Sequence, residues 1–288
     1  MHSTTSLLAL ACAALASFAR ASPLDKRLVE VDGFYNPTSN GGRWLTLARN
    51  TYPEGLGEPI NVVVSSDSDG LIMTDTGFFD WSQSIQFSGE CLGSTGSGAK
   101  QAANLGDGLG FINQTILLRE NFGDLSVGTC RETVQGGYHY RVWRQNGTEA
   151  NSGAWFLAAS EEEPLAQQHM ITDNGYDIGR DQVVSRATVA GGTISPLTNR
   201  TFVTTVTNVS GQGYFADVTT SEINHGISTD GIVAVLTVKI TSNGTQPNIA
   251  IGASGPTGAK IGSASSVFPI SQVATLGLFS LLALGLLL

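Results

Sequence analysis

Alternation of apolar and polar positions predicts β-strands in the middle of the chain. Residues 138–144 (Tyr-His-Tyr-Arg-Val-Trp-Arg) alternate, and the apolar run 154–159 follows a tight-turn sequence, Asn146-Gly147. We therefore expect a β-hairpin over residues 138–159. Other apolar or β-branched runs predict further strands over residues 41–47, 60–64, 201–209 and 231–240.

Two other segments have the spacing expected of helices. Apolar residues recur at near-helical intervals from Leu71 onward, which predicts a helix from Asp69, its N-cap, to about Ser84. A second helix is expected over residues 177–187, with Asp177 as N-cap. Runs of strands with two helices among them predict an α+β domain: a single mixed or antiparallel sheet with two or so helices packed on it.

The start of the sequence has the pattern of a secretory signal peptide. The apolar stretch Leu7–Phe18 is followed by Ala19-Arg20-Ala21, a small-x-small cleavage pattern, so residues 1–21 are expected to be removed. Residues 22–27 end in the dibasic pair Lys26-Arg27. This pair is either the processing site of a short propeptide or an ordinary exposed basic pair.

The last sixteen residues, 273–288, are uncharged and apolar, and small residues lie upstream at 262–266. This pattern is typical of a glycosylphosphatidylinositol (GPI) attachment signal, here residues 264–288, with Ser263 as the lipidated residue. A short C-terminal transmembrane helix is the alternative. The Ser/Gly/Thr-rich residues 242–263 are then a disordered stalk behind a folded domain of residues 28–241.

Composition agrees with the secretory pathway. The net charge of −9 argues against nucleic acid and anionic membrane surfaces as partners. Cys91 and Cys130 are the two cysteines outside the signal peptide, and an even pair in a secreted chain predicts a disulfide. The chain carries five glycosylation sequons, at Asn113, Asn146, Asn199, Asn208 and Asn243. The expected location is the outer face of the plasma membrane or the cell wall.

The order of several short motifs resembles the LssY C-terminal-like domain family. The motifs are His139-Tyr-Arg-Val-Trp-Arg144, Trp155-Phe-Leu-Ala-Ala-Ser160, His169-Met-Ile, Asp177-Ile-Gly-Arg-Asp181 and Thr229-Asp-Gly231. The family has H-x-R-x-W-R and V-W-x-G-A-A strands and a His-containing segment that ends in E-R-D. Here Gly179 replaces the glutamate, and Gln168 stands where a second histidine is common. The resemblance spans roughly residues 55–240 and implies domain limits, but no activity is established for the family. The dibasic pair and the GPI-type tail are typical of a fungal surface protein.

Three histidines, His139, His169 and His225, lie outside the signal peptide, and with Asp181 they are the candidate catalytic residues. Such a cluster either binds a divalent metal or supplies a general acid and base. Their spacing matches no known ligand pattern, so the alternative is that each is a structural or surface histidine. The sequence predicts no particular cofactor, and the alternative to a chain without a cofactor is one that binds a divalent metal ion.

Arg141 and Arg180 are the candidates for binding an anionic substrate. Arg141 shares a strand face with His139, whereas Arg144 lies on the opposite face. The alternative for Arg141 is cross-strand pairing, and for Arg180 an internal ion network with Asp181. The run Glu161-Glu162-Glu163 is interpreted as a solvated loop. The four tryptophans either form the core or line a sugar-binding face.

The sequence therefore favours a membrane-anchored surface glycoprotein with a binding or structural role, whose partner is a cell-wall polysaccharide or another surface protein. The alternative function is a surface hydrolase that acts on a phosphorylated or glycosylated substrate through the His/Asp cluster.

Overall fold

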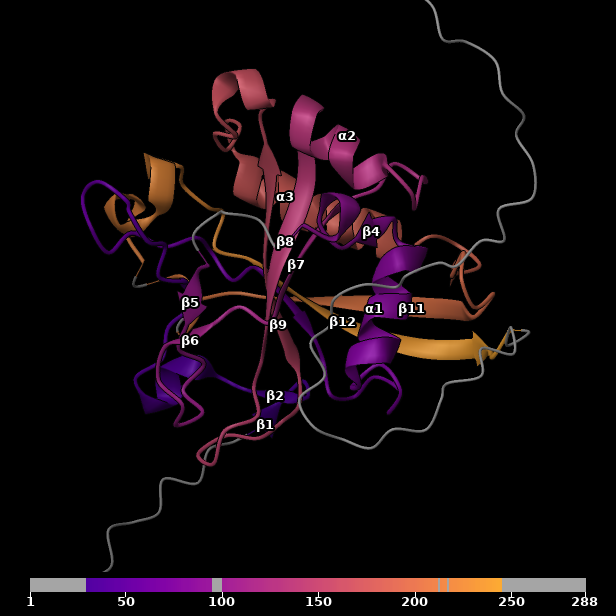
Figure 1. Cartoon of the computed structure of the whole chain (residues 1–288). Coiled ribbons are helices and arrows are strands. Elements are labelled where there is room, and N and C mark those ends of the chain that lie inside the picture. The colour runs from indigo at the N-terminus through magenta and orange to yellow at the C-terminus, as the bar shows by residue number, and fades with distance from the viewer. Residues whose placement is uncertain (1–29, 95–99, 212, 217, 245–288) are drawn as a thin grey trace, which may run out of the picture.

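The computed structural model describes residues 30–94, 100–211, 213–216 and 218–244. Its centre is an eight-stranded mixed sheet in the order β10-β11-β12-β3-β9-β8-β7-β4 (Figure 1). Within this sheet β12 and β3 are parallel and the other neighbours are antiparallel. The strands are β3 Val62–Val64, β4 Phe87–Ser88, β7 Ile116–Glu120, β8 Gly137–Arg144, β9 Trp155–Glu162, β10 Thr193–Ile194, β11 Thr201–Val209 and β12 Val233–Ser242.

Three helices pack on this sheet, which confirms the α+β class. They are α1 Asp75–Ser84, α2 Gly128–Gln135 and α3 Gly175–Ala187. Figure 1 shows α2 and α3 at one end of β8 and β9, and the β11–β12 hairpin extending to the side. Two small sheets complete the fold: β1 Glu30–Val31 with β2 Phe34–Tyr35, and β5 Ala102–Ala103 with β6 Ile112–Asn113.

Alternation along the strands creates an apolar layer on each face of the sheet. Tyr140 and Val142 of β8 pack in one layer with Trp81 of α1 and Val183 of α3. Trp143 and Phe156 pack in the other layer. All four tryptophans are at most 2% exposed, so they form the core and not a sugar-binding face.

Both predicted helix starts are wrong, because tertiary contacts use the expected capping residues. Thr74 caps α1, and the Asp69 carboxylate accepts instead from the N–H of Ile240 on β12. Asn174 occupies the N-cap position of α3 in the left-handed region, with φ 59°. Asp177 lies one turn further on, where it accepts from Thr229 and Asp230.

The hairpin of β8 and β9 is confirmed, but the predicted tight turn is not. The connection runs from 145 to 154, because the Asp107 carboxylate accepts from the N–H groups of both Asn146 and Gly147 and holds them away from a two-residue turn. The strand expected over residues 41–47 is also wrong. Leu45 and Leu47 form only isolated bridges, to Pro59 and Ala102.

Helix α2 is the one described α-helix that the sequence analysis does not predict, and strand β7 is missed as well. Its segment Gly-Thr-Cys-Arg-Glu-Thr-Val-Gln has little apolar periodicity. The predicted Cys91–Cys130 disulfide is present, with a Cα–Cα distance of 4.5 Å, and joins this helix to the turn at 91–93. The cross-link therefore compensates for a weak helical signal.

Within the described residues, none of the helices has the length and apolar character needed to cross a bilayer. The expected signal peptide, propeptide and anchor signal with Ser263 lie outside the described residues, as does the stalk beyond residue 244.

Candidate functional site

A polar cluster lies on one face of the sheet where β7, β8 and β9 run side by side. Arg119 is directly opposite His139, and His139 is directly opposite Ser160. Directly paired residues of antiparallel strands share a face, and Glu162 lies two positions beyond Ser160 on the same strand. Alternation therefore aims these four side chains to the same side of the sheet.

Glu132 of α2 completes this cluster. The Arg119 guanidinium donates to both carboxylates, with 2.9 Å from Nη1 to Glu132 Oε2 and 2.9 Å to Glu162 Oε2. Glu132 is fully buried and Glu162 is 9% exposed. One guanidinium thus faces two buried carboxylates, which leaves an excess of acidic groups.

Two of the histidines predicted from the sequence meet at Glu162. His139 Nδ1 lies 3.5 Å from Glu162 Oε1, and His169 Nδ1 lies 3.5 Å from Glu162 Oε2. Both Nδ1 atoms are buried and have no hydrogen-bond partner within the described part of the chain. The other ring nitrogen of His139 is 3.1 Å from Ser160 Oγ, a contact that fixes the orientation of the ring. His169 follows the short turn Leu165–Gln167 and is one-quarter exposed.

Burial controls the protonation of this cluster. It lowers the pKa of His139 to about 3, although the charge of Glu162 acts in the opposite direction. Burial also raises the pKa of Glu132 to about 8 against the effect of Arg119. Burial alone would raise the pKa of Glu162, but its interactions with His139 and Arg119 outweigh burial and the pKa is lowered. His139 is therefore a neutral imidazole at neutral pH, with a lone pair available on one ring nitrogen.

The arrangement is able to hold a metal ion. Glu132, His139 and Glu162 are all buried, and each offers a ligand atom within 4.8 Å of the others. Imidazole nitrogen with carboxylate oxygen is a donor set typical of transition-metal sites. The unpartnered nitrogen of His139, aimed at a carboxylate, fits such an ion.

The sequence analysis missed Arg119, Glu132 and Glu162. Glu162 belongs to β9 and not to a solvated loop. Because strand positions two apart share a face, its position two residues after Ser160 could have indicated that the two side chains point the same way. Glu132 carried no signal, because it lies on the helix that the sequence does not predict. Arg119 follows the apolar run Ile116–Leu118, but its partners come from distant segments.

Asp181 and His225 take no part in the contacts to Glu162 among the described residues. Asp181 is 68% exposed at its side chain and pairs with Arg180. His225 is exposed on the turn Asn224–Gly226. Only His139 and His169 of the predicted catalytic set therefore meet at Glu162.

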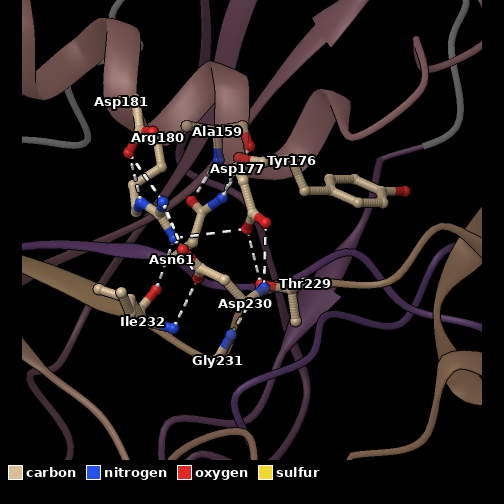
Figure 2. Close-up of polar contacts among 10 residues, drawn as sticks. All are labelled: Asn61, Ala159, Tyr176, Asp177, Arg180, Asp181, Thr229, Asp230, Gly231 and Ile232. Atoms are coloured by element: carbon tan, nitrogen blue, oxygen red, sulfur yellow. Dashed lines mark hydrogen bonds and ion pairs between the residues drawn. The ribbon is translucent and has the colours of Figure 1, made fainter.

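Arg180 is the centre of a second polar cluster (Figure 2). Its guanidinium pairs with Asp230 at 2.6 Å, Asp181 at 2.8 Å and Asp177 at 3.3 Å, and it also donates to the carbonyl of Ile232. The side chain is only 5% exposed. These contacts fit the alternative of an internal ion network, which ties α3 to the start of β12.

Arg141 lies on the same face as His139 but has different partners. Its Nε is 3.7 Å from Glu58 Oε2, and its Nη1 donates to Gln114 Oε1 at 3.0 Å. Arg144 lies over the ring of Trp155 in the opposite layer. The predicted placement of the two arginines on opposite faces is confirmed.

A polar hollow of about 380 Å³ lies beside the Arg180 cluster. Its lining includes hydroxyl groups and the Asp230 carboxylate, contributed by the segments around Ser210, Thr220, Ser228 and Thr229. Asp230 thus belongs to both features, so the ion network fixes one wall of the hollow.

Comparisons with models of protein families, with curated proteins and with solved structures each find no match to this chain. The resemblance to the LssY C-terminal-like family therefore stays a prediction.

Proposed function

We propose that this protein is a secreted surface glycoprotein, held at the membrane by a GPI anchor, whose folded domain binds a cell-wall polysaccharide. The polar hollow beside Asp230 carries the proposal. Its Ser and Thr hydroxyl groups both donate and accept hydrogen bonds, and its carboxylate accepts them. The hydroxyl groups of a sugar ring require that combination.

Two further observations support the surface role. The disulfide suits an oxidising compartment. The five sequon asparagines, which lie in separate loops and strands, are all exposed on the folded domain, as an attached glycan requires.

The polysaccharide proposal is tested by co-sedimentation of the purified full chain with insoluble glucan, chitin and mannan. Ser228 lines the hollow and is exposed, so Ser228→Trp fills the hollow without disturbing the core. We expect retention on one polymer and a loss of at least tenfold in the variant. Ser126→Trp, at an exposed serine outside the hollow, is the matched control. If no polymer retains the chain, or if Ser228→Trp is retained equally, the polysaccharide proposal is wrong. Binding of a surface protein in place of a polymer would favour the alternative partner.

The surface hydrolase is the second candidate, because His139 and His169 meet at one buried carboxylate. A neutral imidazole beside an ionised carboxylate is a standard acid–base arrangement. This candidate predicts turnover of an aryl phosphate or an aryl glycoside by the full chain. The turnover should disappear in His169→Ala and persist in His225→Ala, whose side chain is exposed outside the cluster. Absence of turnover on both substrate types rules this candidate out.

A further inference from the structure

His139 has the orientation expected of a metal ligand. In metal sites the ring nitrogen that does not bind the ion is held by a hydrogen bond, which fixes the tautomer and the direction of the ring. Here Ser160 Oγ lies 3.1 Å from Nε2, and the opposite nitrogen faces Glu162. The side chain is only 1% exposed, and yet that nitrogen has no hydrogen-bond partner within the described residues.

The spacing of the donors also suits an ion. A tetrahedral ion about 2.1 Å from each ligand separates two ligands by about 3.4 Å. The 3.5 Å between His139 Nδ1 and Glu162 Oε1 agrees with that value and is too long for a good hydrogen bond. Glu132 lies within 4.8 Å of both, so a small rotation of its carboxylate brings it into reach.

Arg119 holds both carboxylates in place beside His139. It donates to both oxygens of Glu132 and to Glu162 Oε2. These hydrogen bonds fix the orientation of both carboxylates. The other oxygen of Glu162, Oε1, lies on the His139 side, where an ion shared with His139 Nδ1 would bind.

From these contacts we infer that Glu132, His139 and Glu162 bind one divalent transition-metal ion. His169 is outside this set of ligands, because its Nδ1 faces the other oxygen of Glu162, which accepts from Arg119. Mixed imidazole and carboxylate ligands favour Zn²⁺ or Mn²⁺ over Ca²⁺ and Mg²⁺, which prefer oxygen ligands only. The inference is independent of polysaccharide binding, because it involves different residues.

The test uses the full chain, secreted from a eukaryotic host, chelated, and then titrated with Zn²⁺ or Mn²⁺ alone. Elemental analysis should find about one ion per chain. The melting temperature should rise by about 5–10 °C when the free ion exceeds its Kd a hundredfold. A chain that binds neither ion and shows no change in melting temperature overturns the inference.

Three variants locate the ion. His139→Gln and Glu162→Gln keep the size of the side chain and remove one ligand, and each should abolish the bound ion and the shift. His225→Gln is the matched control, since His225 is exposed and outside the cluster, and it should bind as the wild type does. Full binding by both cluster variants overturns the assignment. If the cluster variants do not fold, the wild-type titration still decides the question.

Discussion

At the scale of single residues, Arg119 is the side chain on which the polar cluster depends. Its guanidinium is 13% exposed and donates to two buried glutamates. Removing one partner of a buried ion pair leaves the other charge without compensation, which is costlier than the pair is stabilising. Because Arg119 is mostly buried and its glutamate partners are buried, we expect the loss of Arg119 to lower the free energy of unfolding more than the loss of an exposed arginine.

We predict that Arg119→Met lowers the free energy of unfolding by about 3–5 kcal/mol, because Glu132 and Glu162 lose their shared cation. Urea unfolding at neutral pH measures the change. Arg43→Met is the control, since Arg43 and its partner Glu222 are both more than one-third exposed, and it should cost about 1 kcal/mol or less. Equal effects in the two variants would contradict the assigned role of Arg119.

Gly179 gives a second prediction at this scale. A Cβ at this position would overlap the backbone of Ser160 on β9, so α3 lies against the strand at this glycine. Gly179→Ala should therefore lower stability by about 1–3 kcal/mol, although alanine is the better helix former. Gly89→Ala, where a Cβ meets open space, should be close to neutral. A stabilised Gly179→Ala variant would show that α3 lies further from β9.

At the scale of elements, α2 has only eight residues and holds Glu132 over the sheet. Helices this short are unstable alone in water, so their stability comes from packing and cross-links. The Cys91–Cys130 disulfide supplies such a link across 39 residues. The position of Glu132 therefore depends on the disulfide.

We predict that Cys91→Ser with Cys130→Ser costs about 4 kcal/mol of stability, from the loop entropy that the cross-link removes from the unfolded chain. Hydrogen exchange should accelerate most over 128–135 and little in α3. Equal acceleration of both helices would indicate global destabilisation and not release of α2.

The start of α3 is tied to β12 through Arg180 and Asp230, and acid should weaken this tie. Burial opposes ionisation of Asp230, but the hydrogen bonds from Arg180 outweigh it and lower the pKa of Asp230. A carboxyl whose pKa is lower in the folded state stabilises the fold above its unfolded pKa of about 3.9 and loses that effect as the pH falls through the folded value. Asp177 and Asp181 face the same guanidinium.

The stability difference between the wild type and Asp230→Asn should therefore be constant from pH 7 to about pH 5 and shrink below pH 4. Denaturant unfolding at several pH values measures it. Asp173→Asn, at an exposed aspartate outside this network, is the control. A difference that grows on acidification would contradict the pairing with Arg180.

The sequence predicted elements whose signal is local and missed those that depend on distant partners. Strict alternation identifies β8, and the apolar run that follows it identifies β9. The Thr/Val-rich run 201–209 coincides with β11. The helix starts failed because Asp69 and Asp177 bond to β12 and to Thr229 instead of capping. The His139–Glu162 contact could not be predicted either, because it depends on the register of β8 against β9, two strands whose pairing the sequence does not specify residue by residue.

At the scale of the whole molecule, the exposed sequons distribute over separate regions of the surface. Asn146 lies in the β8–β9 connection, Asn208 near the end of β11, and Asn243 directly after β12. A protein with glycans at these positions would be shielded on several sides. This arrangement suits a surface-displayed binding domain.

We predict that enzymatic removal of N-glycans reduces the apparent mass of the secreted chain, because all five sequon asparagines are accessible. Mass spectrometry of the released peptides identifies the occupied positions. The disulfide-bonded fold should survive the treatment, as judged by an unchanged circular dichroism spectrum. A secreted chain without any occupied sequon would contradict the proposed glycoprotein.

The buried centre formed by Glu132, His139 and Glu162 is the central claim, and anomalous X-ray diffraction of the zinc-loaded protein tests it most directly. The account predicts one strong anomalous peak at the zinc edge, within about 2.2 Å of His139 Nδ1 and of an oxygen of each glutamate. A map without a peak at this position, in which Arg119 alone joins the two carboxylates, would contradict it.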